Sequence, residues 1–237
     1  MQGKTHRWGG LALGAGATLA TVGSIDGFSA VMMTGTLMTG AALGSLIPDL
    51  DHQGSELSKK IKPLGMAVSS VCHHRGFTHT GLAWFMFTLV CAAIVTVLNL
   101  VKVDNWGTSA IIGGMFALIV VSIVKWIAKT FHINRLRRVT YGFINTLVMT
   151  GVLFVIFTLF ADYMVKYLGY YFIGLSVGYL SHLLVDMLTV SGVPMLYPHS
   201  EKMYRFANLK TGEDDNWVSM ILSIATVALV TLRVGLI

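Results

Sequence analysis

The sequence has 237 residues, of which 54% are hydrophobic and 12% are charged. Because soluble globular domains carry about 25% charged residues, this composition excludes an ordinary soluble domain and indicates an integral membrane protein with several helices. The net charge of +6 is typical of basic loops that determine membrane topology, so we expect no nucleic-acid partner. The two cysteines, Cys72 and Cys91, form no CxxC or zinc-knuckle spacing, and Cys72 is expected to fill apolar space.

Apolar runs predict an all-α fold, a polytopic membrane helix bundle of about seven spans. The first run follows a basic N-terminus and superficially resembles a signal peptide, but further spans follow it, so we expect a retained helix. The first two runs are rich in Gly and Ala, which favours close packing inside the bundle. We expect one integral membrane domain over residues 1–237, with a polar loop at 48–80. The predicted spans are residues 8–23, 28–47, 81–101, 109–124, 143–161, 170–188 and 217–236.

The distribution of basic residues predicts the orientation. With seven spans, every Lys and Arg except Lys102, Lys166 and Arg233 falls on the side of the N-terminus. By the positive-inside rule this side is cytoplasmic, so we expect the N-terminus and loop 48–80 at the cytoplasmic face of a bacterial inner membrane. The basic segment 125–138 would attract anionic lipid head groups, although its role as a topology determinant is enough to explain it.

Polar residues with metal-ligand chemistry begin at the end of the second span. Asp49 and Asp51 stand one residue apart beside His52, and such carboxylates with an imidazole suit a divalent-metal site. The alternative is a solvated helix C-terminus, where the helix dipole disfavours Asp. This pattern favours metal binding.

A histidine cluster follows just before the third span. His73, His74 and His79 flank Arg75. Imidazoles favour zinc and related transition metals, and the nearby carboxylates also allow iron or manganese. Arg75 cannot lose its proton and is expected to hold an anion. The neighbouring hydroxyl residues are expected to cap the third helix; they are Thr78 and Thr80.

The sixth span carries His182 and Asp186, four residues apart and therefore on one helix face. Ionisable residues inside a span are costly and usually functional. The alternative is a buried His–Asp hydrogen bond that joins two helices. The topology places this pair, together with His6, at the same face as loop 48–80, which favours function. His132 and His199 are expected to be surface residues.

These pieces together resemble the YdjM-type family of bacterial inner-membrane, metal-dependent hydrolases, described as LexA-regulated. The resemblance implies a helical membrane protein, a presumed hydrolase activity and a ligand set similar to that of zinc-dependent phospholipase C, which also uses HxxxD pairs. It selects His74 over His73, and it suggests regulation by DNA damage (the SOS response). Thr80 stands where the family has serine, and no role carries over to residues 190–237. The matching pieces are Thr5-His6-Arg7, Pro48-Asp49-Leu50-Asp51-His52, His74-Arg75-Gly76-Phe77-Thr78-His79, and His182-Leu183-Leu184-Val185-Asp186 with Thr189.

We therefore expect an enzyme with two or more divalent metal ions, zinc before iron or manganese. A metal-activated water would attack a phosphorus of a phospholipid or other lipid phosphate. Arg75 would hold a phosphate oxygen, and Asp51 would serve as the general base if it is not a ligand. Peptide and acyl bonds stay open as alternative substrates. The expected ligands are His6, Asp49, Asp51, His52, His74, His79, His182 and Asp186.

The second hypothesis is a membrane protein that binds metal without catalysis, such as a metal or proton transporter or a sensor. A transporter requires polar residues along a path through the bilayer. The third, fifth and seventh spans carry almost no charge, and the polar residues collect at one face. This asymmetry favours an interfacial site. The sequence does not indicate the oligomeric state.

Overall fold

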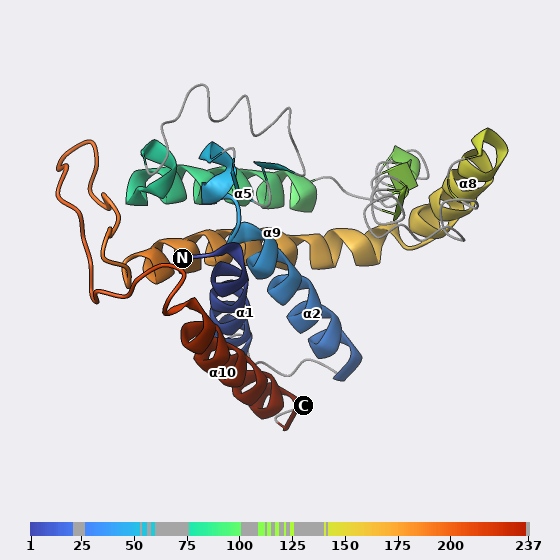
Figure 1. Cartoon of the computed structure of the whole chain (residues 1–237). Coiled ribbons are helices and arrows are strands. Elements are labelled where there is room, and N and C mark those ends of the chain that lie inside the picture. The colour runs from blue at the N-terminus through green and yellow to red at the C-terminus, as the bar shows by residue number, and fades with distance from the viewer. Residues whose placement is uncertain are drawn as a thin grey trace. The chain divides into compact units, whose positions relative to one another are not determined.

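The computed structural model is all-helical over the residues that it describes (Figure 1). These are residues 1–20, 27–52, 54–55, 58–59, 76–100, 109–111, 113–114, 117–118, 121, 124–125, 140 and 142–235. Over these residues no β-strand is formed beyond two isolated bridges. The elements are α1 (Gly3–Ala20), α2 (Gly27–Gly44), the short 3-10 helices η1 (Pro48–Asp51) and η2 (Phe77–His79), α5 (Gly81–Leu100), α8 (Phe143–Leu159), α9 (Ala161–Asp186) and α10 (Asp215–Gly235).

The helices agree with the apolar runs of the sequence. Three stretches are long and apolar enough to cross a membrane, and α5 and α8 include shorter apolar segments. The predicted helical membrane fold is therefore confirmed, while the count of seven spans and their orientation stay predictions. The fourth predicted span, residues 109–124, lies largely outside the described residues. The three long stretches are Ser29–Asp51, Tyr167–Asp186 and Asp215–Leu232.

Two helix starts differ from their predictions. The first span was expected from residue 8, but α1 begins at Gly3, and the difference at α9 is larger. The sixth span was expected from residue 170, but α9 begins at Ala161, directly after Phe160. Asp162 and Lys166 interrupt the apolar run, yet polar residues are compatible with a helix. The hydrophobic pattern therefore located the apolar part of α9 and missed its first turns.

The chain forms two compact units. The first combines Met1–Val95 with Tyr167–Ile237, and the second is Thr96–Lys166. In the second unit, α8 has no buried residue, and Phe143 at its start is 83% exposed. Such an apolar surface suits contact with lipid. All the described residues predicted to form the site belong to the first unit.

Within the first unit, α1 packs between α2 and α10 (Figure 1). Gly10 of α1 lies so close to α2 that a Cβ atom there would come within 2.4 Å of the Ala41 carbonyl oxygen. On the other side, Thr5 Oγ1 donates a hydrogen bond to Asp215 Oδ1 of α10 at 2.8 Å. These contacts fix the first turns of α1, which carry His6.

Helices α2 and α9 cross in direct backbone contact through two GxxxG pairs. Small residues at this spacing allow helix backbones to approach closely in a membrane. A Cβ atom at any of these glycines would lie 2.1–2.2 Å from a carbonyl oxygen of the opposite helix. The crossing brings the C-terminal part of α2 against the C-terminal half of α9. The glycines are Gly40 and Gly44 of α2, and Gly174 and Gly178 of α9.

Helix α5 packs on α9 through polar and apolar contacts. Trp84 Nε1 donates to the Ser176 carbonyl oxygen at 3.1 Å, and the Thr88 and Ser176 hydroxyl oxygens lie 2.6 Å apart. Ala83 also packs in a core cluster with Tyr179 and Leu183 of α9. As a result η2, directly before α5, lies beside the end of α9.

Candidate metal centre

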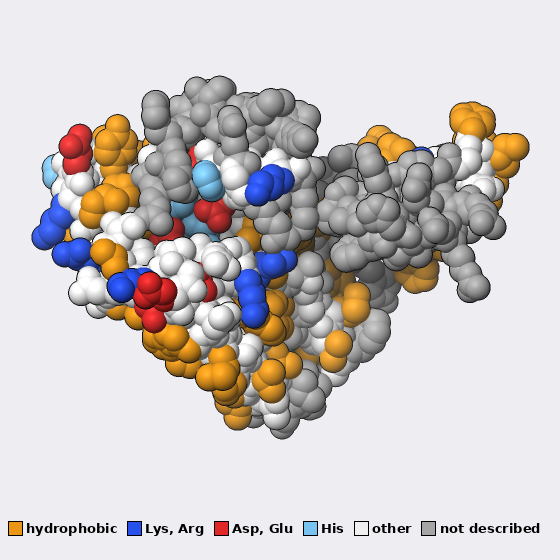
Figure 2. All heavy atoms as spheres, in the orientation of Figure 1, with side chains coloured by type: hydrophobic (Ala, Val, Ile, Leu, Met, Phe, Trp, Pro, Cys, Tyr) orange, Lys and Arg blue, Asp and Glu red, His pale blue; other side chains and the backbone are white. Residues whose placement is uncertain are grey.

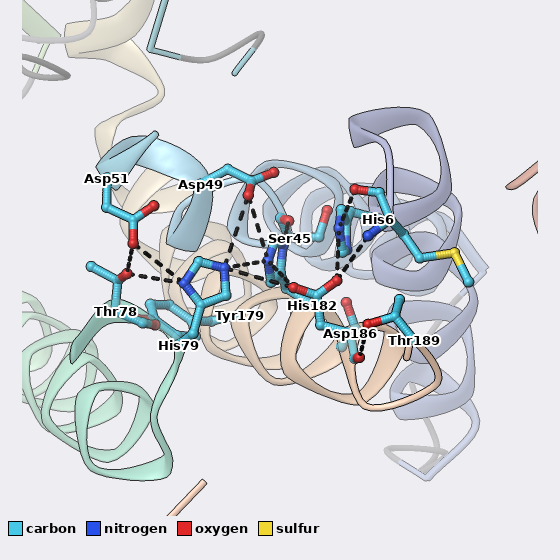
Figure 3. A network of polar contacts seen from close by, with 12 residues as sticks. His6, Ser45, Asp49, Asp51, Thr78, His79, Tyr179, His182, Asp186 and Thr189 are labelled. Atoms are coloured by element: carbon cyan, nitrogen blue, oxygen red, sulfur yellow. Dashed lines mark hydrogen bonds and ion pairs between the residues drawn. The ribbon is translucent and has the colours of Figure 1, made fainter. Parts of the chain in front are cut away.

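Four segments far apart in the sequence bring polar side chains to the C-terminal end of α9 (Figure 3). Helix α1 contributes His6, η1 contributes Asp49 and Asp51, and η2 contributes His79. The last turns of α9 contribute the i, i+4 pair of His182 and Asp186. In Figure 2, histidine and acidic side chains are visible in a hollow of the described surface.

Local structure explains how η1 and η2 present their side chains. Pro48 starts the 3-10 turn of η1 at a position where its missing N–H costs nothing. Thr80 Oγ1 accepts the backbone N–H of Ala83 at 3.0 Å, which confirms the predicted cap of α5. Thr78 does not take that role, and its hydroxyl donates to Asp51 Oδ2.

Four possible donor atoms, from Asp49, His79, His182 and Asp186, include the two imidazole Nε2 atoms of the centre and two carboxylate oxygens close to them. The two Nε2 atoms of the histidines lie 3.2 Å apart. Asp186 Oδ2 is 3.4 Å from His182 Nε2 and 3.7 Å from His79 Nε2. Asp49 Oδ1 is 3.8 Å and 3.9 Å from the same two nitrogens. A tetrahedral zinc site with bonds of about 2.0–2.2 Å has ligand–ligand edges of about 3.3–3.6 Å. The separations between the two histidines and Asp186 are close to these edges, whereas Asp49 and Asp186 belong to different groups of possible ligands.

The tautomer of His182 follows from its hydrogen bond to α2. His182 Nδ1 lies 2.7 Å from the Ser45 carbonyl oxygen, and both residues are buried. Because a carbonyl only accepts, Nδ1 carries the proton and Nε2 presents a lone pair. Nε2 lies 3.4 and 3.8 Å from two carboxylate oxygens and 3.2 Å from His79 Nε2, an arrangement that a cation, or a proton on His79 Nε2, would stabilise. Such an outer hydrogen bond is typical of metal-ligating histidines.

Asp51 lies beside Nδ1 of His79, the ring nitrogen that points away from His182. Its Oδ2 atom is 3.4 Å from His79 Nδ1 and accepts the Thr78 hydroxyl. Tyr179 OH donates to the Thr78 carbonyl oxygen at 2.5 Å, which ties this turn to α9. A carboxylate on the far nitrogen of a ligating histidine fixes the ring and raises its basicity. This geometry favours Asp51 as a partner of His79, outside the four possible donor atoms of the centre.

A second group of possible ligands shares residues with the first. It contains His6, His182 and Asp186. The His6 ring stacks on that of His182 with centroids 3.7 Å apart, and His6 Nε2 lies 3.5 Å from Asp186 Oδ1. Asp186 Oδ2 thus faces His79 and His182, and Asp186 Oδ1 faces His6. The Met1 amino nitrogen is 3.0 Å from Asp186 Oδ1, so a positive group already lies at this second position.

His6 combines burial with an unsatisfied nitrogen. Among the described residues, no hydrogen-bond partner reaches its Nδ1 atom. Burial is the main cause that holds the pKa of His6 well below its ordinary value. The ring is therefore neutral at pH 7, which is the form that binds metal.

Other predicted site residues lie elsewhere or outside the described part of the chain. His52 is exposed at the end of η1 and belongs to neither ligand group formed by the described residues. His73, His74 and Arg75 fall outside the described residues, as does the surface candidate His132. Their predicted roles stay predictions.

Three residues support the centre in ways that the sequence did not predict. Ser45 contributes only its carbonyl oxygen, which no side-chain pattern reveals. Thr78 was expected to cap a helix. Tyr179 stands three residues before His182 and therefore on the same face of α9. That spacing could have predicted that Tyr179 lies near the site.

Comparison with known proteins identifies one family over nearly the whole chain and relatives that match parts of it. A family model described as "YdjM inner membrane protein" matches residues 1–125 and 113–236. The inner membrane protein YdjM of Escherichia coli (strain K12) is 25% identical over 162 residues, which cover 68% of this chain and 49% of that protein. The uncharacterized protein YvsG of Bacillus subtilis (strain 168) is 34% identical over 95 residues, or 40% of this chain and 54% of that protein. The chain thus spans about half the length of these curated relatives. No solved structure shows significant similarity to it.

Proposed function

This chain belongs to the family of YdjM inner membrane proteins, and from that premise we propose that it is a membrane-embedded, metal-dependent hydrolase. The proposed substrate is a phosphate ester of a phospholipid or another lipid phosphate at the cytoplasmic face. One observation carries the proposal: the lone pair of His182 Nε2 faces His79 Nε2 and two carboxylate oxygens, all within 3.8 Å. A cation at this position, or a proton on His79 Nε2, would offset the repulsion between the lone pair and the carboxylates.

The donor set fits a divalent transition metal. Two imidazole nitrogens with two carboxylate oxygens suit zinc, and they also suit iron or manganese. The first position would be held by Asp49, His79 and His182, with Asp186 Oδ2 3.4 and 3.7 Å from the two imidazole nitrogens, and a second by His6 with the other oxygen of Asp186. When bound, such ions supply Lewis acidity and lower the pKa of a coordinated water. If two ions bind, both would draw on Asp186.

The remaining residues are proposed to prepare the site for a substrate. Asp49 is the most exposed ligand, at 19% for its side chain, so a substrate would approach on its side. Asp51 would hold His79 in position, which leaves the general base unassigned. Arg75 is proposed to bind a phosphate oxygen, since its guanidinium matches that geometry.

A lipid substrate is supported by the position of the ligands in the chain. His182 and Asp186 occupy the end of the candidate span Tyr167–Asp186, where a membrane-spanning helix would meet the phospholipid head groups. Their HxxxD spacing is also that of zinc-dependent phospholipase C, which supports a phosphodiester as the bond that is cleaved.

Metal binding without catalysis is the competing function. It is favoured by the complete burial of His6 and His182, which suits an ion held for structure, sensing or transport. The two functions share the metal but differ in turnover.

Metal content comes first in the test. Mass spectrometry would compare the detergent-purified wild type with the Asp49→Ala, His182→Ala double variant. The control is His199→Ala, because His199 is exposed and lies outside both ligand groups. We expect near-stoichiometric metal in the wild type and the control, and its loss in a folded double variant. A folded wild type that takes up no zinc, iron or manganese would overturn the proposal.

Activity then separates hydrolase from binding protein. The metal-loaded wild type would be incubated with phospholipids and other lipid phosphates in mixed micelles, and released phosphate or phosphorylated head group would be measured. Product that depends on the metal and on Asp49 supports the hydrolase. Stoichiometric metal without turnover on any of these lipids would leave the non-catalytic function as the better interpretation.

A further inference from the structure

The segment between α9 and α10, residues 187–214 (here the α9–α10 loop), is a folded structure of its own. Val193 and Tyr204 exchange backbone hydrogen bonds at 3.1 and 2.8 Å, and Thr189 pairs with Leu209. Gly192 allows this pairing, because its φ is 64° and a Cβ atom there would lie 2.6 Å from the Tyr204 carbonyl oxygen, and both features disfavour a side chain. The loop therefore holds its exposed side chains in place.

The base of this loop is attached to the end of the unit that carries the candidate metal centre. The Met195 carbonyl oxygen accepts the N–H of Gly81 at the start of α5, at 2.9 Å. Phe206 N donates to the Met187 carbonyl oxygen at 2.7 Å, directly after α9. In Figure 1 the loop extends from the end of α9 away from α10.

Several large apolar side chains of the loop point away from the core. Phe206 is 73% exposed and Leu196 is 50% exposed. An ordered loop that keeps such groups outside its core presents an apolar surface that favours contact with something other than water. The exposed apolar residues are Val190, Leu196, Tyr197, Met203 and Phe206.

The composition of this surface matches a bilayer interface. Lys202 and Arg205 are exposed beside the apolar residues, and Lys202 Nζ lies 5.7 Å from the centroid of the Tyr204 ring. Aromatic rings with adjacent basic groups are enriched where protein meets the head groups. Further along, Lys210 is paired with Glu213 at 3.3 Å, so that end of the loop is a charged, solvated surface.

The neighbouring helices continue the same surface. The loop joins two candidate spans, which end at Asp186 and begin at Asp215. Directly after the loop, α10 begins an exposed apolar row with Trp217, Met220 and Ile221. If these helices cross the membrane, the loop between them lies at the level where hydrocarbon gives way to head groups.

We propose that the α9–α10 loop inserts its apolar side chains, chiefly Leu196 and Phe206, into the head-group region of the bilayer beside the candidate metal centre. The occupant of this surface is phospholipid. The inference does not depend on hydrolase activity, because it rests on the loop and on the two candidate spans.

The test places a fluorescent probe on single cysteines in full-length protein. Starting from a Cys72→Ala, Cys91→Ala background, an NBD label is attached at Leu196→Cys, Phe206→Cys and, as the control, Glu213→Cys. Each protein is reconstituted in nanodiscs of phosphatidylethanolamine and phosphatidylglycerol. Lipids with a doxyl group near the head group report contact with the bilayer, and iodide reports contact with water. Tyr197→Cys replaces either test position if that variant does not purify as a monodisperse species.

At positions 196 and 206 we expect blue-shifted emission and at least about twofold stronger quenching by doxyl lipid than at position 213, because side chains in the interface touch the acyl boundary. Equal iodide quenching at all three positions would overturn the proposal. Protection from both quenchers would also overturn it, since it would show that protein covers the surface.

Discussion

Two buried aspartates near the start of α1 show how differently the same side chain is used. Asp186 is 3% exposed and Asp215 is 4% exposed, and each lies at one end of a candidate span. Asp215 accepts hydrogen bonds from Gln2 N, Thr5 Oγ1 and Gly212 N at 2.6–3.1 Å. These ordinary donors satisfy its charge, so Asp215 serves to join α1 to α10.

Asp186 has a different set of neighbours. Three imidazole nitrogens lie 3.4–3.7 Å from its oxygens, which is longer than most N–H···O hydrogen bonds. One of these nitrogens, His182 Nε2, carries no proton in the neutral ring because Nδ1 donates to Ser45. Asp186 Oδ1 also accepts the Met1 amino group at 3.0 Å. Burial alone therefore does not identify a ligand, whereas the contact of Asp186 Oδ2 with a nitrogen that carries no proton favours one.

The largest expected difference between the two aspartates is in metal binding. Asp186→Asn keeps the shape of the side chain but removes the charge that faces both ligand groups. We expect metal affinity to fall by more than the roughly 10–100-fold that loss of an outer partner costs. Isothermal titration of metal into chelator-treated protein measures this, with Asp215→Asn as the matched control. Equal metal affinity in the two variants would show that Asp186 contributes no more to metal binding than Asp215 does.

Asp51 is expected to show an intermediate effect. As the partner of His79 it should lose about 10–100-fold in metal affinity on Asp51→Asn, the range typical of outer partners of a ligating histidine. The same titration on Asp49→Asn should give a larger loss. If the two variants lose equal affinity, Asp51 is itself a ligand, as the sequence predicted.

Asp215→Asn should instead affect folding. Loss of a charged acceptor for three donors is expected to cost about 1–3 kcal/mol of stability. Thermal unfolding in detergent would show a lower midpoint, while the metal bound per folded molecule stays that of the wild type. A loss of metal in protein that is still folded would place Asp215 in the site.

The smallest expected effect is a pH dependence from His6. Because its folded pKa lies below the unfolded value, the metal-free folded state binds fewer protons than the unfolded chain as pH falls below about 6.5. Stability should therefore decline toward acid by up to about 1.4 kcal/mol per pH unit. His6→Gln should flatten this decline in chelator-treated protein, and His199→Gln should leave it unchanged. An unchanged slope in His6→Gln would show that other groups set the pH dependence.

Much of this arrangement could be predicted from the sequence. The i, i+4 spacing of His182 and Asp186 and the PDLDH segment pointed to the residues that the structure brings together. Apolar runs located α2, α5, α8 and α10 to within a few residues. These features depend on local periodicity, which a single sequence records.

The remaining features depend on contacts between distant segments. The hydrogen bond from His182 to Ser45 joins a side chain to a backbone oxygen 137 positions away, and side-chain patterns do not reveal such an acceptor. The position of Asp51 beside Nδ1 of His79, and of His52 at the surface, depends on how η1 meets η2. The folded α9–α10 loop rests on pairings such as Val193 with Tyr204, in a segment with no clear strand pattern.

The glycine crossing of α2 and α9 has a consequence for the chemistry of the site. It sets the gap between the two helix axes, and the Ser45 oxygen follows directly after Gly44 at that crossing. A methyl group at Gly44 or Gly178 would push the helices apart and lengthen the bond that fixes the tautomer of His182. Because the four glycines have no side chains, the two helices approach closely enough for the Ser45 oxygen to accept the proton of His182 Nδ1. The glycines thereby help to determine that Nε2 is the nitrogen of His182 without a proton.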